Sequence, residues 1–311
     1  MLSMSYELQP DVPLGKNLRR LFRRQLNDAI SLAKGEGQPN DTLVHDFRKH
    51  LKKARAALQL VRAQAGKRTW RRQHCRLLDA GRLTREVRDA EVRLQTMRQL
   101  EDAMRRHYLS YQKIERLLAE ELESFRAAFA DWEIDAIRLL ERAKKSTTEW
   151  HLRACKEKHV RRAIRRTYEA ARNALRIARK RTSVASIHEL RKHVKLLGYQ
   201  VSLIRPWNHL VIGEAQEELT DLGHLLGRIH DLAFLGDRLR FERREKHWGK
   251  QDDELLAAIE ATEAMLRRDG IEIADRIFAE RPRKFARYID EWFTDRRHTR
   301  LNHVAEILVN A

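Results

Sequence analysis

One short phrase occurs twice in this chain. Residues 45–50 read His-Asp-Phe-Arg-Lys-His, and residues 188–193 read His-Glu-Leu-Arg-Lys-His, 143 positions later. A repeat limits the fold more than any other sequence feature, because the chain must build a similar unit each time. Each copy opens a long amphipathic stretch, so the phrase predicts two similar helices.

Two further landmarks extend the repeat on either side of the phrase. Residues 19–24 (Arg-Arg-Leu-Phe-Arg-Arg) match residues 161–166 (Arg-Arg-Ala-Ile-Arg-Arg), and the Arg-Asp pair at 88 and 89 matches the His-Asp pair at 230 and 231. Both matches have an offset of 142 residues. The landmarks therefore predict a duplicated unit of about four helices, as in a pair of helical bundles related by a pseudo-twofold axis.

Helix breakers are scarce in this chain. Only 12 of its 311 residues are Gly and 5 are Pro, while 42% are hydrophobic. No run of alternating β-branched residues indicates a strand. We therefore predict an all-α fold with a flexible N-terminal arm over 1–12, a first four-helix bundle over 13–150, and a second four-helix bundle with extra short C-terminal helices over 151–311.

Caps and breakers give the expected helix limits within each half. Asp41 or Thr42 caps the first copy of the phrase, and Ser183 or Ser186 caps the second. The expected helices cover about 13–34, 42–66, 67–100, 104–145 with a break near 131, 152–181, 186–205, 213–247 and 254–268, followed by shorter ones.

The chain is strongly basic throughout. It holds 64 Lys and Arg against 45 Asp and Glu, a net charge of +19, divided as +10 over residues 1–150 and +9 over 151–311. A field of this sign attracts nucleic acid, polyphosphate or anionic lipid.

The basic residues of each phrase form a stripe beside the apolar face of its helix. On a helical wheel, the stripe of His45, Arg48, Lys52 and Arg55 flanks the core-facing side chains, and the second copy repeats this arrangement. Long cationic side chains also cover the edge of a core with their stems, which is the structural alternative. Two such stripes with two Arg clusters favour a shared anionic ligand, because clustered cations repel one another.

The same residues resemble the CHAD family, the α-helical domain named for its histidines. His45, Arg48, Lys52, Lys53 and Arg55 match its first motif, and His188, Arg191, Lys195 and Tyr199 match its second. The resemblance covers about residues 14–300. It implies two antiparallel four-helix bundles around a central basic groove, inorganic polyphosphate as the ligand, and in some members association with polyphosphate granules. Gly198 departs from the family pattern, which has Arg before the Tyr. This removes one cation, and we expect either weaker binding by the second unit or a closer approach of the phosphate chain to the backbone.

The predicted function is thus polyphosphate binding by a protein that is not an enzyme and needs no cofactor or metal. Arg grips phosphate oxygens in pairs and Lys acts as a point charge. The candidate binding residues are Arg19, Arg20, Arg23, Arg24, His45, Arg48, Lys49, Lys52, Lys53, Arg55, Arg88, Arg161, Arg162, Arg165, Arg166, His188, Arg191, Lys192, Lys195 and Arg228.

Three alternatives remain. A protein that binds nucleic acid through its phosphates needs the same cations, although the motif helices offer few aromatic residues for base stacking. The His-Asp pairs at 45 and 230 are also found in metal-dependent phosphohydrolases, but Arg88 stands where the first unit would need a ligand. Basic amphipathic helices also bind anionic lipid surfaces. His45 and His188 either face the ligand or bond a neighbouring helix.

The remaining features place the chain in a reducing compartment. Its two cysteines, Cys75 and Cys155, have no metal-ligand spacing and are expected to be free thiols. Residues 1–13 show no signal-peptide pattern, and charged residues interrupt every apolar stretch. We therefore expect a cytoplasmic protein without a membrane span.

Overall fold

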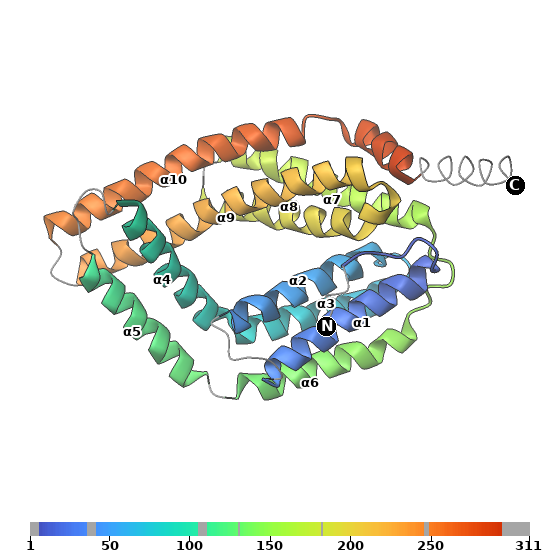
Figure 1. Ribbon diagram of the computed structural model, residues 1–311, viewed down its shortest axis with the longest axis horizontal. Helices are drawn as coiled ribbons and strands as arrows, with labels where there is room; N and C mark the ends of the chain where they lie inside the picture. The colour runs from blue at the N-terminus through green and yellow to red at the C-terminus, as the bar shows by residue number, and fades with distance from the viewer. Residues whose placement is uncertain are drawn as a thin grey trace, which may run out of the picture.

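The computed structural model describes residues 6–35, 42–104, 111–129, 131–181, 183–245 and 249–293. Every regular element in these ranges is a helix, as predicted (Figure 1). The helices are α1 (Leu14–Ala33), α2 (Leu43–Leu60), α3 (Lys67–Leu83), α4 (Arg85–Met104), α5 (Gln112–Ala128), α6 (Trp132–Lys145), α7 (Glu157–Lys180), α8 (Val184–Ile204), α9 (His209–Glu245) and α10 (Lys250–Ile277), with short 3₁₀ turns at Ser146–Glu149 and Arg205–Trp207 and a final helical segment over 282–293. Across this part of the chain, no helix combines the length and apolarity that crossing a membrane requires.

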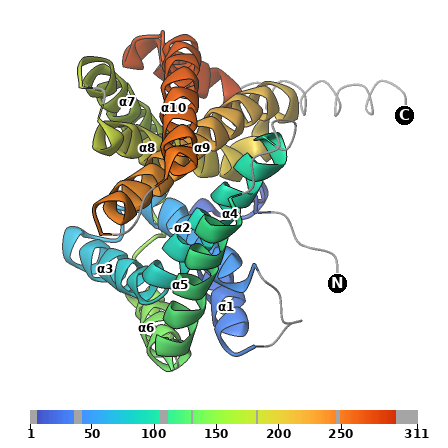
Figure 2. The ribbon, with the colours of Figure 1, turned by 90° about the vertical axis from the view of Figure 1, so that its left-hand side faces the viewer.

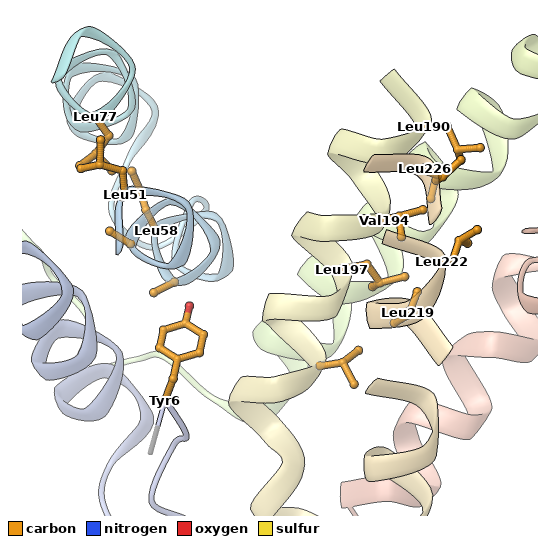
Figure 3. Packing of buried hydrophobic residues seen from close by; sticks show 14 of the residues in the cluster. Tyr6, Leu51, Leu58, Leu77, Leu190, Val194, Leu197, Leu219, Leu222 and Leu226 are labelled. Carbon is orange, nitrogen blue, oxygen red and sulfur yellow. The ribbon is translucent and has the colours of Figure 1, made fainter. Parts of the chain in front are cut away.

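The helices gather into two layers that correspond to the two halves of the chain. Helices α1, α2, α3 and α6 pack together in one layer, and α7, α8, α9 and α10 in the other (Figure 2). Within the second layer, Leu190, Val194 and Leu197 of α8 interdigitate with leucines of α9 (Figure 3). Helix α2 meets α7 and α8 across the middle of the molecule, so the two copies of the phrase come to face each other.

The helix limits repeat along the chain with the offset seen in the sequence. Helix α3 begins at Lys67 and α9 begins at His209, 142 residues later. The single long helix α9 thus covers the stretch that in the first half is divided between α3 and α4. The pseudo-twofold relation and the domain boundary at residue 150 remain predictions.

The division between α3 and α4 corrects the single helix expected over 67–100. Thr84 leaves helical geometry with φ −106° and ψ 16°. The carbonyl of Gly81, which a continuous helix would bond internally, instead accepts hydrogen bonds from the guanidinium of Arg48 and from the Thr84 hydroxyl. Side-chain donors have therefore replaced one backbone bond, and this permits a kink.

The kink directs α4 out of its own layer and onto α9 of the other. Arg93 on α4 is buried, donates to Glu121 on α5 at 2.9 Å, and lies over the ring of Phe234. Arg238 on α9 donates to the same Glu121 carboxylate at 3.3 Å. One carboxylate thus joins α4, α5 and α9, and it binds the two halves together at one end of the molecule.

The N-terminal segment from residue 6 onward is ordered by packing, which differs from the flexible arm expected over 1–12. Tyr6 and Leu8 are buried, at 9% and 1% exposure. The Tyr6 hydroxyl donates to the carbonyl of Lys53 at 2.6 Å, and the Leu8 amide donates to the carbonyl of Leu203 at 2.8 Å. The segment therefore ties α2 to α8, and burial of two large apolar side chains offsets the entropy of ordering it. Residues 1–5 lie outside the described part.

Several other expected limits shift by a few residues, as helix ends usually do. Asp131 adopts the left-handed conformation (φ 75°) and separates α5 from α6, as expected. Helix α10 runs from Lys250 to Ile277, well beyond the expected 254–268, because Gly270 is packed inside it against Ile229 of α9. Cys75 and Cys155 are free thiols, as predicted.

Candidate functional site

The two motif helices place their basic stripes at the meeting of the two layers. Helix α8 begins at a Ser183 cap whose hydroxyl accepts from the Ser186 amide, so His188 falls in its second turn. Phe47 on α2 and Leu190 on α8 are fully buried in their own layers. Because the stripe lies beside these core residues, it points across the interface towards the opposite half.

Five cations from both halves act on one another at this interface. We call Arg48, Lys52, Arg88, Arg191 and Lys195 the central cluster. The pKa of Lys52 is lowered to about 7, first by burial and then by the positive charges of Arg191, Arg48, Lys195 and Arg88. Since Lys52 belongs to α2 and both Arg191 and Lys195 to α8, the structure brings the two motifs together.

Lys195 shows the same effect from the other side. Its pKa is lowered to about 8 by burial and by Arg191, while Asp231 opposes the shift. A half-buried lysine without an ion-pair partner loses charge readily, because water no longer solvates the ammonium and neighbouring cations repel it. The cluster is therefore electrostatically unsatisfied in the free protein.

Two glycines of α9 give the α8 cations room to lie along the interface. A Cβ at Gly223 would stand 3.3 Å from Cε of Lys195, and a Cβ at Gly227 would stand 3.4 Å from Nε and Nη2 of Arg191. The stems of both cations thus lie directly over glycine. Gly81 on α3, 142 residues before Gly223, similarly exposes the carbonyl that Arg48 bonds. These glycines position the cations, and sequence reasoning missed them although the repeat offset links the pair.

We expect Gly223→Ala combined with Gly227→Ala to weaken anion binding by about three- to tenfold. Each new methyl group displaces a cation by a few tenths of an ångström, while alanine in a helix stabilises the fold by roughly 1 kcal/mol per site. Gly213→Ala is the matched control, because nothing lies within 4 Å of its Cβ on the same helix. Isothermal titration and thermal unfolding measure both quantities. Equal affinity for the double variant and the control would remove these glycines from the site.

Arg48 and Arg88 have structural bonds as well as a place in the cluster. Arg48 donates to the Gly81 carbonyl and, at 3.4 Å, to the Thr84 hydroxyl, so it holds the kink between α3 and α4. Arg88 pairs with Glu91 at 3.3 Å on its own helix. Lys52 and Lys195 have no such ion-pair partner among the described residues, which makes them the best-suited cations for a ligand.

The acidic residues near the cluster are few. Burial raises the pKa of Asp231, and it is opposed by the charges of Arg191, Arg88, Lys52 and Lys195. Asp231 thus stands among four cluster cations as their one buried counter-charge in the described chain. Asp89, which we expected to orient a groove arginine, pairs instead with the exposed Arg85 at 3.4 Å.

The histidines lie at the edge of the cluster and are neutral there. His45 is exposed, and its pKa is lowered by burial of part of the ring and by Arg88 and Lys52. The pKa of His188 is lowered to about 4 by burial, His230 and Arg191. The rings of His188 and His230 stand 4.7 Å apart, and the buried Nδ1 atom of each has no hydrogen-bond partner among the described groups. His188 therefore packs against another histidine while it borders the cluster.

The arginines predicted on α1 point elsewhere. Arg19 donates to the carbonyl of Trp150, where the chain crosses between the halves. Arg20 bonds Asn17 at 2.9 Å, Arg23 is exposed, and Arg24 lies 3.9 Å from Asp28. These side chains follow the outer surface of α1, because the helix buries its apolar face against α2 and α6.

Four predicted residues of the motif helices also lie outside the central cluster. Lys49 pairs with Asp46 at 3.8 Å and Lys192 with Glu189 at 2.8 Å, both exposed on their own helices. Lys53 stands over the ring of Tyr6 at 5.0 Å. Arg55 lies between α2 and α3, where its charge lowers the pKa of His74.

The α7 arginines divide between two surfaces. Arg161 pairs with Asp290 at 2.8 Å, and Arg165 lines the same hollow beside the helical segment over 282–293. Arg162 and Arg166 line a separate cavity of about 420 Å³ with Arg62 and His193. Arg228 is exposed, and none of the charges that act on Lys52, Lys195 or Asp231 is its own. A helix of cationic repeats must distribute them around its axis, so the doublets could not all face one site.

Gly198 lies half-buried against α9. A Cβ there would meet the Cβ of Leu219 at 3.7 Å, an ordinary contact. A longer side chain would have to run along α9 to reach the interface. Leu219 covers this backbone, so the close approach of a phosphate chain that we considered at Gly198 has no room.

No group of three or more His, Cys, Asp or Glu side chains is arranged to hold a metal ion within the described ranges. The geometry instead defines an all-α protein with a cationic cluster shared by two repeated helices.

Comparison with known proteins gives the family. The model of the CHAD domain matches residues 20–240, so the chain belongs to the CHAD family. Among solved structures, the crystal structure of the CHAD domain from the plant Ricinus communis is similar, with a TM-score of 0.66 and 16% identity over 91% of this chain and 97% of that one. At that identity the likeness supports the fold alone. No curated protein matches the chain. The CHAD family is associated with polyphosphate binding in general.

Proposed function

We propose that this protein binds inorganic polyphosphate through the central cluster. The observation that carries the proposal is the pair of lysines, Lys52 and Lys195, whose pKa values fall to about 7 and about 8 because like charges surround them. Such a cluster destabilises the free protein unless it serves a polyanion, because binding restores both charges and satisfies every cation at once. Family membership supports the same ligand.

The aromatic residues near the cluster favour polyphosphate over single-stranded nucleic acid. Tyr199 meets Tyr6 edge to face at 6.3 Å, and the Tyr6 hydroxyl is bonded to the Lys53 carbonyl. Phe234 lies under Arg93 and beside His230. These rings are occupied by protein contacts, whereas a single-strand binder offers free rings on which bases stack.

The proposal describes a binding protein rather than an enzyme, in a cytoplasmic setting and with association to polyphosphate granules as a consequence of its affinity. Arg162 and Arg166, together with the outer arginines of α1, would contact only those parts of a long chain that leave the cluster. The continuous groove that the sequence suggested is part of this proposal.

A competition experiment tests the proposal. The protein is held on labelled long-chain polyphosphate at near-physiological salt and challenged with unlabelled polyphosphate, single-stranded DNA and duplex DNA at equal phosphate concentration. We expect polyphosphate to displace the label at concentrations at least tenfold lower than either DNA. Equal competition by DNA would show that the net charge of +19 acts without selectivity, and the nucleic-acid alternative would replace this proposal.

A further inference from the structure

A second site lies in the other half of the molecule, away from the cationic cluster. A cavity of about 700 Å³ opens between α7, α8, the first turns of α9, the end of α10 and the helical segment over 282–293. That volume is typical of small-molecule sites. None of the five cluster residues lines it.

The interior of this cavity is aromatic and preformed. Tyr168 and Phe285 stack with ring centroids 3.7 Å apart, and Phe285 meets Trp292 edge to face at 6.0 Å. The Tyr168 hydroxyl donates to the carbonyl of Glu280 at 3.0 Å, which fixes the turn that joins α10 to the last helical segment. Leu197 and Leu219, which face each other in Figure 3, also line it.

The charge of this cavity is opposite to that of the protein. Lys and Arg make up 64 of the 311 residues, so a random set of fifteen would hold about three. The fifteen lining residues include no Lys, Arg or His, and their charged members are Glu214, Glu218, Glu280 and Glu291. A local reversal of sign within a strongly basic chain indicates a ligand that the rest of the surface repels.

Most of these carboxylates have no cation of their own. Glu280 pairs with Lys284 at 2.6 Å beside the cavity. Glu214, Glu218 and Glu291 form no ion pair with any residue in the described ranges, and all three are exposed at the mouth. The site therefore has an aromatic interior and an acidic rim.

We propose that this cavity binds an organic amine, a ligand with a protonated nitrogen and an apolar body. The ammonium lies at the rim against Glu214 and Glu218, and the apolar body packs on the aromatic interior formed by Tyr168, Phe285 and Trp292. Aromatic faces attract cations as well as apolar groups, which adds to the preference for an amine. This site is independent of the proposed polyphosphate binding.

Three ligands of equal size separate charge from shape. The full-length protein is titrated with 4-phenylbutylamine, 4-phenylbutan-1-ol and 4-phenylbutyrate by calorimetry. We expect the amine to bind at least tenfold more tightly than the alcohol, and the carboxylate to bind most weakly. The net charge of +19 favours the reverse order, so a carboxylate preference, equal binding of amine and alcohol, or no binding of the amine would each overturn the proposal.

Neighbouring glutamates of α9 provide the matched control. Glu218→Gln removes a rim charge, whereas Glu217→Gln removes an exposed charge that does not line the cavity. We expect Glu218→Gln to lower amine affinity about five- to tenfold without changing alcohol affinity, and Glu217→Gln to change neither. Tyr288→Ala, at the exposed edge of the cavity, should weaken all three ligands. An equal response of Glu218→Gln and Glu217→Gln would contradict the site, and polyphosphate affinity, measured in parallel, should stay constant in all three variants.

Discussion

Replacing Lys52 and Lys195 with methionine should weaken polyphosphate binding roughly 100-fold or more. Each lysine contributes a charge-assisted contact of about 1.5–3 kcal/mol when it meets phosphate, and a factor of ten corresponds to about 1.4 kcal/mol. Methionine keeps the apolar stem that packs at the interface, so the change removes charge with little loss of volume. Calorimetry or fluorescence anisotropy with long-chain polyphosphate measures the effect.

The same variant should be more stable than the natural protein. In the free protein, burial and neighbouring cations oppose the charge of both lysines, which lowers the free energy of unfolding at neutral pH. Removing the charges should raise that free energy by on the order of 1–3 kcal/mol. A gain in stability together with a loss of binding is a pattern typical of functional residues.

Lys49→Met with Lys192→Met is the matched control, since it makes the same substitutions on the same two helices. Lys49 and Lys192 are exposed and pair with Asp46 and Glu189, so they lie outside the cluster. Surface pairs of this kind contribute little to stability. We expect an affinity loss of about threefold or less and an unchanged melting temperature. If both double variants lost affinity equally, the ligand would respond to net charge and the central cluster would not be the site.

The sequence predicted the architecture of this molecule better than it predicted which cations converge. Helical periodicity, scarce breakers and the repeat offset indicated an all-α chain, and α2, α7 and α8 begin within a few residues of the expected positions. The kink at Thr84 was not visible, because it depends on Arg48, 36 residues away, reaching the Gly81 carbonyl. A long-range bond of this kind has no local sequence signal.

The candidate site divided in the same way. The wheel correctly placed Arg48, Lys52, Arg191 and Lys195 on the edge of the core that faces the other half. It could not separate them from the α1 and α7 arginines, because the rotation of each helix about its axis is set by tertiary packing. The order of the segment around Tyr6 was missed for a related reason, since one tyrosine and one leucine show no periodicity until the partners that bury them are known.

The kink and the cluster are linked through Arg48. By directing α4 onto α9, the kink places Arg88 close enough to act on Lys52 and Asp231. In the second half the corresponding helix continues without a break, and its glycines seat Arg191 and Lys195 instead. The two copies of the motif therefore contribute to one cluster by different local means.

Polyphosphate affinity should fall steeply as pH rises from 6.5 to 9. In the free protein Lys52 has a pKa of about 7 and Lys195 of about 8, so both lose protons across this range. A bound polyanion favours the charged form and returns both pKa values towards their ordinary range. Binding at pH 8 must then take up about one proton, and affinity should drop at least tenfold over the range, with a limit of several hundredfold if both lysines become fully charged on binding.

Stability should follow the opposite trend in the free protein. The folded-state pKa of each lysine lies below its unfolded value of about 10.4, so the unfolded chain holds more protons between about pH 7 and pH 10. The contribution of these lysines to the free energy of unfolding therefore rises with pH through that window. Saturating polyphosphate should remove this rise, because the bound protein keeps both protons.

Calorimetry in buffers with different ionisation enthalpies measures the proton uptake directly. Long chains are needed, because the terminal phosphates of short ones titrate near neutral pH themselves. Lys52→Met with Lys195→Met should abolish the uptake at pH 8, and Lys49→Met with Lys192→Met should keep it. An uptake that persisted in the first variant would assign the proton to other groups, such as His188, whose pKa of about 4 leaves it neutral and free to gain a proton beside the ligand. Because the lysines alone titrate between pH 7 and 9, while His188 would respond mainly below pH 7, the pH at which uptake is largest distinguishes the two sources.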